Sequence, residues 1–425
     1  MSAFCMGETC MRKRLAAALL AAFLPALLLA GCATAPSAQT NATASSEAKT
    51  EASTTQKPAQ TEAPTTQTAV PTQAAHPTDT PSPNPTPNPD ADIKEALAQM
   101  DLRQKAAQLL MPELPAGRDA LAFAAQAQAG GYVLFAKDVT TEAATRALTD
   151  GLRAASGIPP FIGIDEEGGI VSRLHTARLA GYQKPASASE IGKTGDAANA
   201  LAAGRTIGAA LARLGVNLDF APVCDVLTEP SNTVIGTRAF GGDAALVADM
   251  ASAFRAGLDD FGVLSAPKHF PGHGGTTGDS HDGFVSVPYD AERLAAVEYV
   301  PFARAVAEGV PFIMVGHIAA PNADASGLPA SLSPYFMTAV LRGEMGFNGV
   351  VVTDAMNMGA ITEAYAPGEA AVMAIRAGAD IVLMPADFEA ALDGIVKAVQ
   401  AGELPEARVD EAVLRVLRAK RDAGL

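Results

Sequence analysis

The sequence predicts an α/β fold: a single (β/α)8 TIM-like barrel over residues 91–425, preceded by a signal peptide and a disordered tether. Two patterns predict the barrel. Short β-branched apolar runs alternate repeatedly with Ala-rich runs of helical period, and the apolar runs are nearly continuous, as in parallel strands covered by helices on the outside. A doubly wound parallel sheet has the same alternation and is the alternative.

The predicted strands share this apolar, β-branched composition. They are residues 107–111, 131–136, 160–165, 216–223, 263–269, 311–317, 349–354 and 380–384. Between them, apolar residues recur every three or four positions, which predicts amphipathic helices. The clearest of these helices are residues 197–214, 244–261, 291–308 and 334–345.

Residues 1–31 have the pattern of an export signal. Three basic residues at 12–14 precede an apolar run from Leu15 to Ala30, which is short for a membrane span. Leu-Ala-Gly-Cys at 29–32 is similar to a bacterial lipobox, which implies cleavage before Cys32 and diacylation of its sulfur. Met11 is a more natural start than Met1, because the basic region follows it directly. An uncleaved signal anchor is the alternative.

Residues 32–90 are rich in Thr, Ala, Ser and Pro and contain almost no large apolar side chain. Such a segment cannot bury enough apolar surface to fold, so it predicts a disordered tether with polyproline character near its end. Together with Cys32, the tether predicts an exported protein on the outer face of the cell membrane, on the cell-wall side, that contacts the membrane through its lipid alone.

Composition narrows the choice of partners. The chain is 48% hydrophobic, enough for a large core, and its net charge is −15. That charge argues against nucleic-acid binding and against binding to anionic membranes. Beyond Cys32 the sequence has one cysteine, Cys224, so no disulfide is expected and Cys224 is predicted to be a small buried hydrophobe. We expect a monomer.

Polar residues stand at the ends of several predicted strands. Asp165 ends the third, Lys268 and His269 end the fifth, His317 ends the sixth and Asp354 ends the seventh. The carboxyl ends of barrel strands meet at one rim, where the active sites of such barrels lie. The convergence of these residues predicts a binding or catalytic site.

Residues 268–281 combine three histidines, a lysine and an aspartate in a Gly-rich segment that cannot form a regular helix and is predicted to be a loop. Asp279 and His281 stand two apart, so in extended chain they share one side, where the carboxylate can orient the imidazole and raise its pKa. A general acid needs that arrangement. His269, His273, Asp279 and His281 are also competent metal ligands, and spacing alone does not exclude a metal site.

K-H-F-P-G-H-G at 268–274 followed by D-S-H at 279–281 resembles glycoside hydrolase family 3, in its bacterial β-N-acetylglucosaminidase (β-hexosaminidase) branch. The resemblance covers most of residues 95–425. It implies a retaining exo-β-N-acetylglucosaminidase without metal or other cofactor, acting on glycans or muropeptides that contain N-acetylglucosamine. It also implies that the His281–Asp279 pair is the general acid/base.

The same resemblance assigns the other roles. Asp354, in V-V-V-T-D-A-M at 350–356, matches the catalytic nucleophile. Five residues match positions that hold the sugar hydroxyls: Asp165, Arg173, Arg238, Lys268 and His269.

One departure from the family pattern is Ile170, which stands where relatives often have an arginine in I-D-Q-E-G-G-R and removes a cation from the rim. The sequence stops at Leu425, so the expectation is that the loop supplies the acid, not a second domain. The alternatives are a β-glucosidase, a β-xylosidase or a phosphate-using member of the family. A sugar-binding lipoprotein without turnover is the alternative from another class.

Cys32→Ala should release the otherwise full-length protein from membranes, because the cysteine sulfur is the predicted acylation site. Fractionation of cells that express each form, followed by immunoblotting, measures the distribution. Retention of the variant in the membrane fraction would favour the uncleaved signal anchor.

Overall fold

The structure is a computed structural model, and it describes residues 90–116, 119–278, 283 and 285–425. These residues belong to one compact unit, Pro83–Leu425. The predicted signal peptide, Cys32 and residues 32–89 of the tether lie outside the described residues. So do Asp279 and His281.

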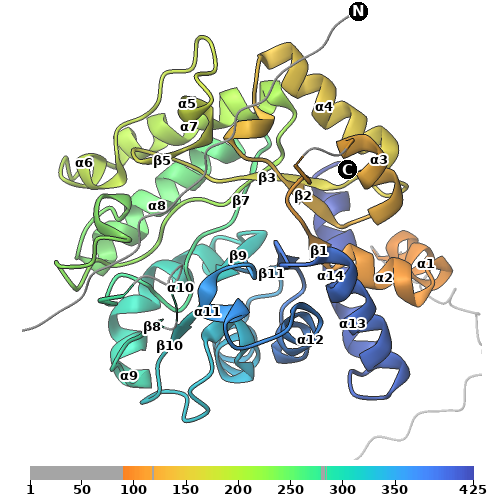
Figure 1. Ribbon diagram of the computed structural model, residues 1–425. Helices are drawn as coiled ribbons and strands as arrows, with labels where there is room; N and C mark the ends of the chain where they lie inside the picture. Colours follow the sequence, from red (N-terminus) through yellow and green to blue (C-terminus); the bar gives the residue numbers. More distant parts are fainter. Residues whose placement is uncertain (1–89, 117–118, 279–282, 284) are drawn as a thin grey trace, which may run out of the picture. The chain divides into compact units, whose positions relative to one another are not determined.

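Short parallel strands form the centre of the described domain, and helices lie around them (Figure 1). The strands that carry the main pairing are β1 (Leu110–Met111), β2 (Gly131–Val133), β3 (Phe161–Ile164), β6 (Leu218–Asp219), β7 (Leu264–Ser265), β9 (Phe312–Val315), β11 (Val350–Thr353) and β12 (Val382–Leu383).

These strands pair in one continuous order. Strand β2 pairs with β3, β3 with β6 and β6 with β7, while β9 pairs with β11 and β12 with β1, all in parallel. Single parallel bridges supply the three remaining links: Glu113–Val133, Phe270–Val315 and Val352–Ile381. A fourth bridge, Val223–Lys268, extends the pairing of β6 with β7. Followed from β1, the pairing passes through all of these strands and returns to β1.

Two further strand pairs lie outside this order. Strands β4 (Glu166–Gly168) and β5 (Val171–Ser172) form an antiparallel hairpin directly after β3. Strands β8 (Val285–Ser286) and β10 (Ile318–Ala319) pair in parallel. The β4–β5 hairpin matters for the site, because it places acidic residues beside the carboxyl end of β3.

The described helices connect the strands and cover them. The α-helices are α1 (Ala91–Gln99), α2 (Leu102–Gln108), α3 (Ala120–Ala127), α4 (Glu142–Ala155), α5 (Arg173–Thr176), α6 (Ala188–Gly192), α7 (Ala197–Leu214), α8 (Ala244–Asp259), α9 (Ala291–Arg293), α10 (Val300–Ala307), α11 (Gly359–Thr362), α12 (Pro367–Ala377), α13 (Phe388–Gln400) and α14 (Glu406–Asp422). The 3-10 helices are η1 (Ala136–Asp138), η2 (Gly236–Arg238) and η4 (Ala330–Leu332), and the π-helices are η3 (Leu294–Glu298) and η5 (Tyr335–Glu344).

Helix α7 shows how the local sequence sets an element. Asp196 caps its start by accepting a hydrogen bond from the Ala198 N–H, and Gly215, with φ of +73°, ends it in the left-handed conformation that glycine favours. Gly204 faces α8 so closely that an added Cβ would lie 2.0 Å from the Phe254 carbonyl oxygen. The small residue therefore permits the close packing of these two helices.

The predicted alternation of strands and helices is confirmed, with shifts at the boundaries. The helix predicted over 197–214 is α7, whereas the one predicted over 291–308 is interrupted by the π-helix η3. Each strand is shorter than its apolar run. The first strand was predicted too early, since Ala107 and Gln108 belong to α2. A capping box between Asp101 and Gln104 starts that helix, and the helical hydrogen bonds continue through the apolar residues as far as Gln108.

Within the described part of the chain, no helix has both the length and the apolar character needed to cross a membrane.

Candidate active site

A cavity of about 400 Å³ lies at the carboxyl ends of β3, β11 and β12. It is lined by Phe135, Asp165, Glu167, Val171, Arg173, Val234, Arg238, Lys268, His269, His273, Asp354, Ala355, Asn357, Met358 and Met384. The lining includes the predicted nucleophile and all five predicted sugar-binding residues. The structure thus brings these six together, while their individual roles remain predictions. Cys32, Asp279 and His281 lie outside the described residues.

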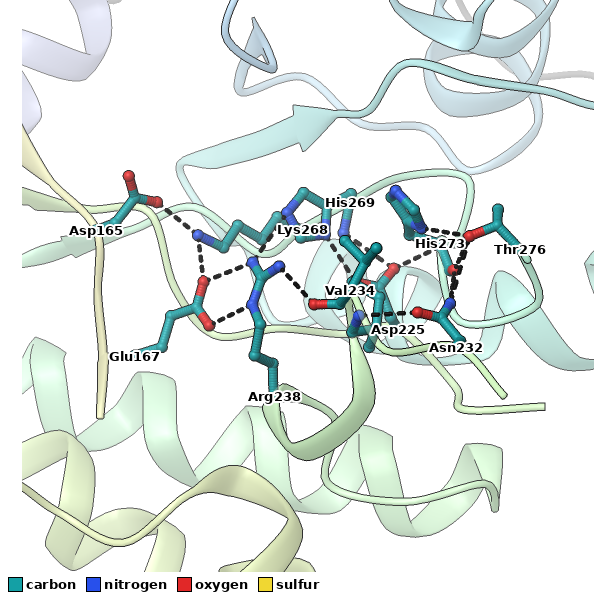
Figure 2. Close-up of polar contacts among 11 residues, drawn as sticks. Asp165, Glu167, Asp225, Asn232, Val234, Arg238, Lys268, His269, His273 and Thr276 are labelled. Carbon is teal, nitrogen blue, oxygen red and sulfur yellow. Dashed lines mark hydrogen bonds and ion pairs between the residues drawn. The ribbon is translucent and has the colours of Figure 1, made fainter. Parts of the chain in front are cut away.

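The ammonium group of Lys268 lies between two carboxylates (Figure 2). Its Nζ is 2.6 Å from Asp165 Oδ1 and 2.7 Å from Glu167 Oε1, and the side chain is 2% exposed. Burial alone would lower the pKa of Lys268, but the two carboxylates outweigh it and raise the pKa. Lys268 is therefore a fixed cation, and the two carboxylates are held at a set distance from each other.

Glu167 is a site residue to which the sequence analysis assigned no role. Arg238, which ends η2, binds it with both ends of the guanidinium group: Nη2 is 2.8 Å from Oε1 and Nε is 2.9 Å from Oε2. Burial opposes ionisation of Glu167, but Arg238 and Lys268 lower its pKa to about 2. A sequence signal was present, because Glu167 stands two residues after Asp165 in extended chain and so shares its side.

Arg173 begins helix α5 and approaches the same cluster from the β4–β5 hairpin. Its Nη2 lies 3.3 Å from Asp165 Oδ2, and its guanidinium group lies 5.3 Å from the centroid of the Phe135 ring. Asp165 thus accepts from Lys268 on one oxygen and from Arg173 on the other. The wall of the pocket presents donors whose positions are fixed by ion pairs.

His269 continues this wall. Its Nε2 lies 3.4 Å from Arg238 Nη2, and its Nδ1 lies 2.7 Å from Asp225 Oδ2. Asp225 is fully buried, and the sequence analysis did not assign it a role. A signal in the sequence was its place two residues after the predicted strand 216–223, close to the strand end, which is also where Asp165 was selected.

His273 lies behind His269, and its ring Nδ1 is 2.8 Å from Thr276 Oγ1. Burial lowers the pKa of the His273 imidazole. Among the described residues, no group of three or more His, Cys, Asp or Glu side chains is arranged to hold a metal ion. Asp279 and His281, the other two candidate metal ligands, lie outside the described part of the chain.

Asp354 follows β11 and faces the same pocket. The backbone N–H of Ala355 donates to its Oδ1 at 2.8 Å. Burial alone would raise the pKa of this carboxyl group, but the nearby imidazoles of His269 and His317 and the Ala355 N–H outweigh it and lower the pKa. The carboxylate is therefore anionic at neutral pH, as a nucleophile must be.

His317 supports Asp354 from behind. Its Nε2 donates to the Ala355 carbonyl oxygen at 3.0 Å, and its Nδ1 lies 2.7 Å from the Ser331 hydroxyl oxygen. The sequence analysis expected His317 at this rim as the end of the sixth predicted strand. It lies just after β9 and is fully buried, so it stabilises the turn that carries Asp354.

The rest of the lining is apolar and includes Phe135, Val171, Val234, Met358 and Met384. A sugar ring has polar edges and apolar faces, so a lining that combines fixed ionic groups with apolar groups suits it. An anionic carboxylate set among hydrogen-bonding groups is an arrangement that glycosidases use. Fold and pocket together define a glycosidase with a strand-end active site.

The chain belongs to glycoside hydrolase family 3, because the model of the glycosyl hydrolase family 3 N-terminal domain matches residues 101–419. This confirms the family predicted from the loop motif. Beta-hexosaminidase LpqI of Mycobacterium tuberculosis is 38% identical over 330 residues, which cover 76% of this chain and 84% of that protein.

Two solved structures are similar over 76% of the chain. One is a family 3 beta-N-acetylglucosaminidase from Paenibacillus, with a TM-score of 0.73 and 38% identity, and the match spans 63% of that protein. The other is a beta-N-acetylhexosaminidase from Beutenbergia cavernae, with a TM-score of 0.69 and 34% identity, of which 99% is covered.

Glu167→Gln should destabilise the protein at neutral pH, and the effect should disappear in acid. The pKa of Glu167 falls from 4.5 to about 2 on folding, so its ionised form contributes stability above pH 4.5 that is lost as the pH falls through about 2. A difference of this size corresponds to roughly 3 kcal/mol of unfolding free energy. Urea unfolding of both proteins at a series of pH values measures it.

Glu142→Gln is the matched control. Glu142 pairs with Arg213 at the surface, where both side chains are about half exposed, so its replacement should change the unfolding free energy little at any pH. A Glu167→Gln deficit that stays constant between neutral and acidic pH would contradict the assignment of the low pKa to Glu167.

Proposed function

We propose that this protein is a retaining exo-β-N-acetylglucosaminidase that hydrolyses terminal β-linked N-acetylglucosamine. The observation that carries the proposal is the anionic Asp354 in a pocket whose lining also holds hydrogen-bonding groups fixed by ion pairs. The relatives described above support the substrate, since they are named as a β-hexosaminidase, a β-N-acetylglucosaminidase and a β-N-acetylhexosaminidase.

In the first step, Asp354 attacks the anomeric carbon of the sugar. The Ala355 N–H holds Oδ1, so Oδ2 is the oxygen that forms the new ester bond. The glycosidic C–O bond breaks, and the departing oxygen takes a proton from His281, which Asp279 orients. Asp165, Arg173, Arg238, Lys268 and His269 bind the hydroxyl groups of the sugar.

In the second step, water attacks the anomeric carbon of the glycosyl ester. His281 takes one proton from the water, and the C–O bond to Asp354 breaks, which regenerates the free carboxylate. Two displacements at one carbon keep the β configuration. A histidine as acid/base departs from the usual pair of carboxylates, and it is proposed here on the resemblance of the loop motif alone.

We further infer that the continuous strand pairing is a (β/α)8 barrel. The return of the parallel order to β1 supports this, because a doubly wound sheet has two edge strands. The proposed setting is the outer face of the cell membrane, with a lipid on Cys32 and muropeptides as substrates. The export pattern and the lipobox-like sequence support that setting.

The protein should hydrolyse 4-nitrophenyl N-acetyl-β-glucosaminide in preference to the matching glucoside and xyloside. Asp354→Asn should keep sugar binding but lower kcat by on the order of 10³-fold or more, because the amide cannot act as an anionic nucleophile. Preference for the glucoside or xyloside, or a requirement for phosphate, would favour the other members of the family. Tight binding without turnover by the wild type would favour a binding lipoprotein.

His281→Ala should form the ester on Asp354 from an activated aryl substrate and then stall. A phenol leaves without much help from an acid, whereas the second step still needs a base to deprotonate water. Mass spectrometry of the intact protein should show an added N-acetylhexosaminyl residue on the peptide that contains Asp354. Equal fractional losses on activated and unactivated substrates, with no ester, would show that His281 is not the acid/base.

A further inference from the structure

Asp225 lies behind the sugar-binding wall, and its two carboxylate oxygens make different contacts. Oδ1 accepts the backbone N–H of His269 at 3.2 Å and that of His273 at 2.6 Å. Oδ2 lies 2.7 Å from the ring Nδ1 of His269. The carboxylate is fully buried, and the proposed mechanism does not use it.

The ionisation state of Asp225 decides which ring nitrogen of His269 carries the proton. Burial alone would raise the pKa of Asp225, but its contacts with His269 and His273 outweigh burial and lower it. An ionised carboxylate can only accept hydrogen bonds, so Nδ1 of His269 must be the donor. In the neutral ring, Nε2 then carries a lone pair, and Nε2 is the nitrogen that lies 3.4 Å from Arg238 Nη2.

We propose that Asp225 is a positioning residue that fixes His269 as the Nδ1–H tautomer, with Nε2 on the pocket side to accept a hydrogen bond from a sugar hydroxyl. The second part rests on the proposed function, since it takes a sugar as the ligand. The first part concerns the ring alone and can be tested without any substrate.

The other oxygen of Asp225 gives the residue a second, separable effect. By accepting from the N–H groups of His269 and His273, Oδ1 holds the chain at the start of the loop. The loop is held further on as well: Asn232 Nδ2 donates to the His273 carbonyl oxygen at 2.9 Å, and Thr276 contacts the His273 ring (Figure 2). Asp225 therefore joins the sugar-binding wall to the base of the loop.

Because the two oxygens of Asp225 have different partners, Asp225→Asn changes the contact with the His269 ring and can keep the contacts with the backbone. The amide oxygen can keep both backbone hydrogen bonds of Oδ1, while its NH₂ group replaces Oδ2 opposite the ring. Because NH₂ can only donate, Nδ1 of His269 must become the acceptor and the proton must move to Nε2. Asp225→Ala removes both effects at once.

The experiment records long-range ¹⁵N–¹H correlation spectra of the histidine rings in the full-length protein, at a pH where the rings are neutral. His269 is assigned by comparison with His269→Gln. The wild type should show the Nδ1–H form and Asp225→Asn the Nε2–H form. The kcat/KM of Asp225→Asn on an aryl N-acetylglucosaminide should fall by about 10- to 100-fold, with a nearly unchanged melting temperature.

Asp324→Asn is the matched control. Asp324 is a partly buried carboxylate that accepts from Ser326 and Ser333 outside the pocket, so its loss of charge should leave kcat/KM and the ring spectra unchanged. Asp225→Ala should lose more activity than Asp225→Asn and should also melt at a lower temperature, because the loop loses its anchor.

Three results would overturn the inference: an Nε2–H ring in the wild type, the same tautomer in Asp225→Asn as in the wild type, or wild-type kcat/KM in Asp225→Asn. The wild-type spectrum decides the tautomer even if a variant fails to fold. A wild type that shows the Nδ1–H ring but does not turn over N-acetylglucosaminides would defeat the proposed function and leave the tautomer assignment standing.

Discussion

The ammonium group of Lys268 is buried among the strand ends, and the need to neutralise it constrains the rest of the site. A buried cation is tolerated only with close counter-charges, and removal of one partner from a buried pair costs about 3 to 5 kcal/mol. Asp165 and Glu167 supply those counter-charges from either side. Glu167 is in turn neutralised by Arg238. Each buried charge therefore fixes the position of the oppositely charged side chain beside it.

This alternation of acidic and basic side chains does not include Asp354, the proposed nucleophile. Asp165, Glu167 and Asp225 each have a direct cationic or imidazole partner. Asp354 instead accepts a hydrogen bond from one backbone N–H, and nearby imidazoles lower its pKa; among the described residues it forms no ion pair with Lys or Arg. A carboxylate neutralised by a close lysine would be a poor nucleophile. In the proposed mechanism, the ion-paired residues bind and orient the sugar, and the less constrained carboxylate of Asp354 reacts.

Sequence reasoning predicted the parts of this site that depend on local pattern. Asp165 and Asp354 could be selected because each follows a β-branched run, and Lys268 and His269 because they open a Gly-rich loop. The partnerships could not be predicted, because Glu167 is 71 residues from Arg238 and Asp225 is 44 residues from His269, and no local periodicity encodes such a pairing. The π-helices were missed for a similar reason, since their apolar spacing resembles that of an α-helix.

The first and last described helices are joined by Asp90. Its carboxylate lies 2.5 Å from Arg418 Nη2 and 3.1 Å from Arg421 Nη1, both on α14, and α1 packs against the same helix. In mechanical terms, tension on the chain ahead of Asp90 passes directly to the final helix through these ion pairs. A load of this kind would therefore fall on these ion pairs before it reached the strands.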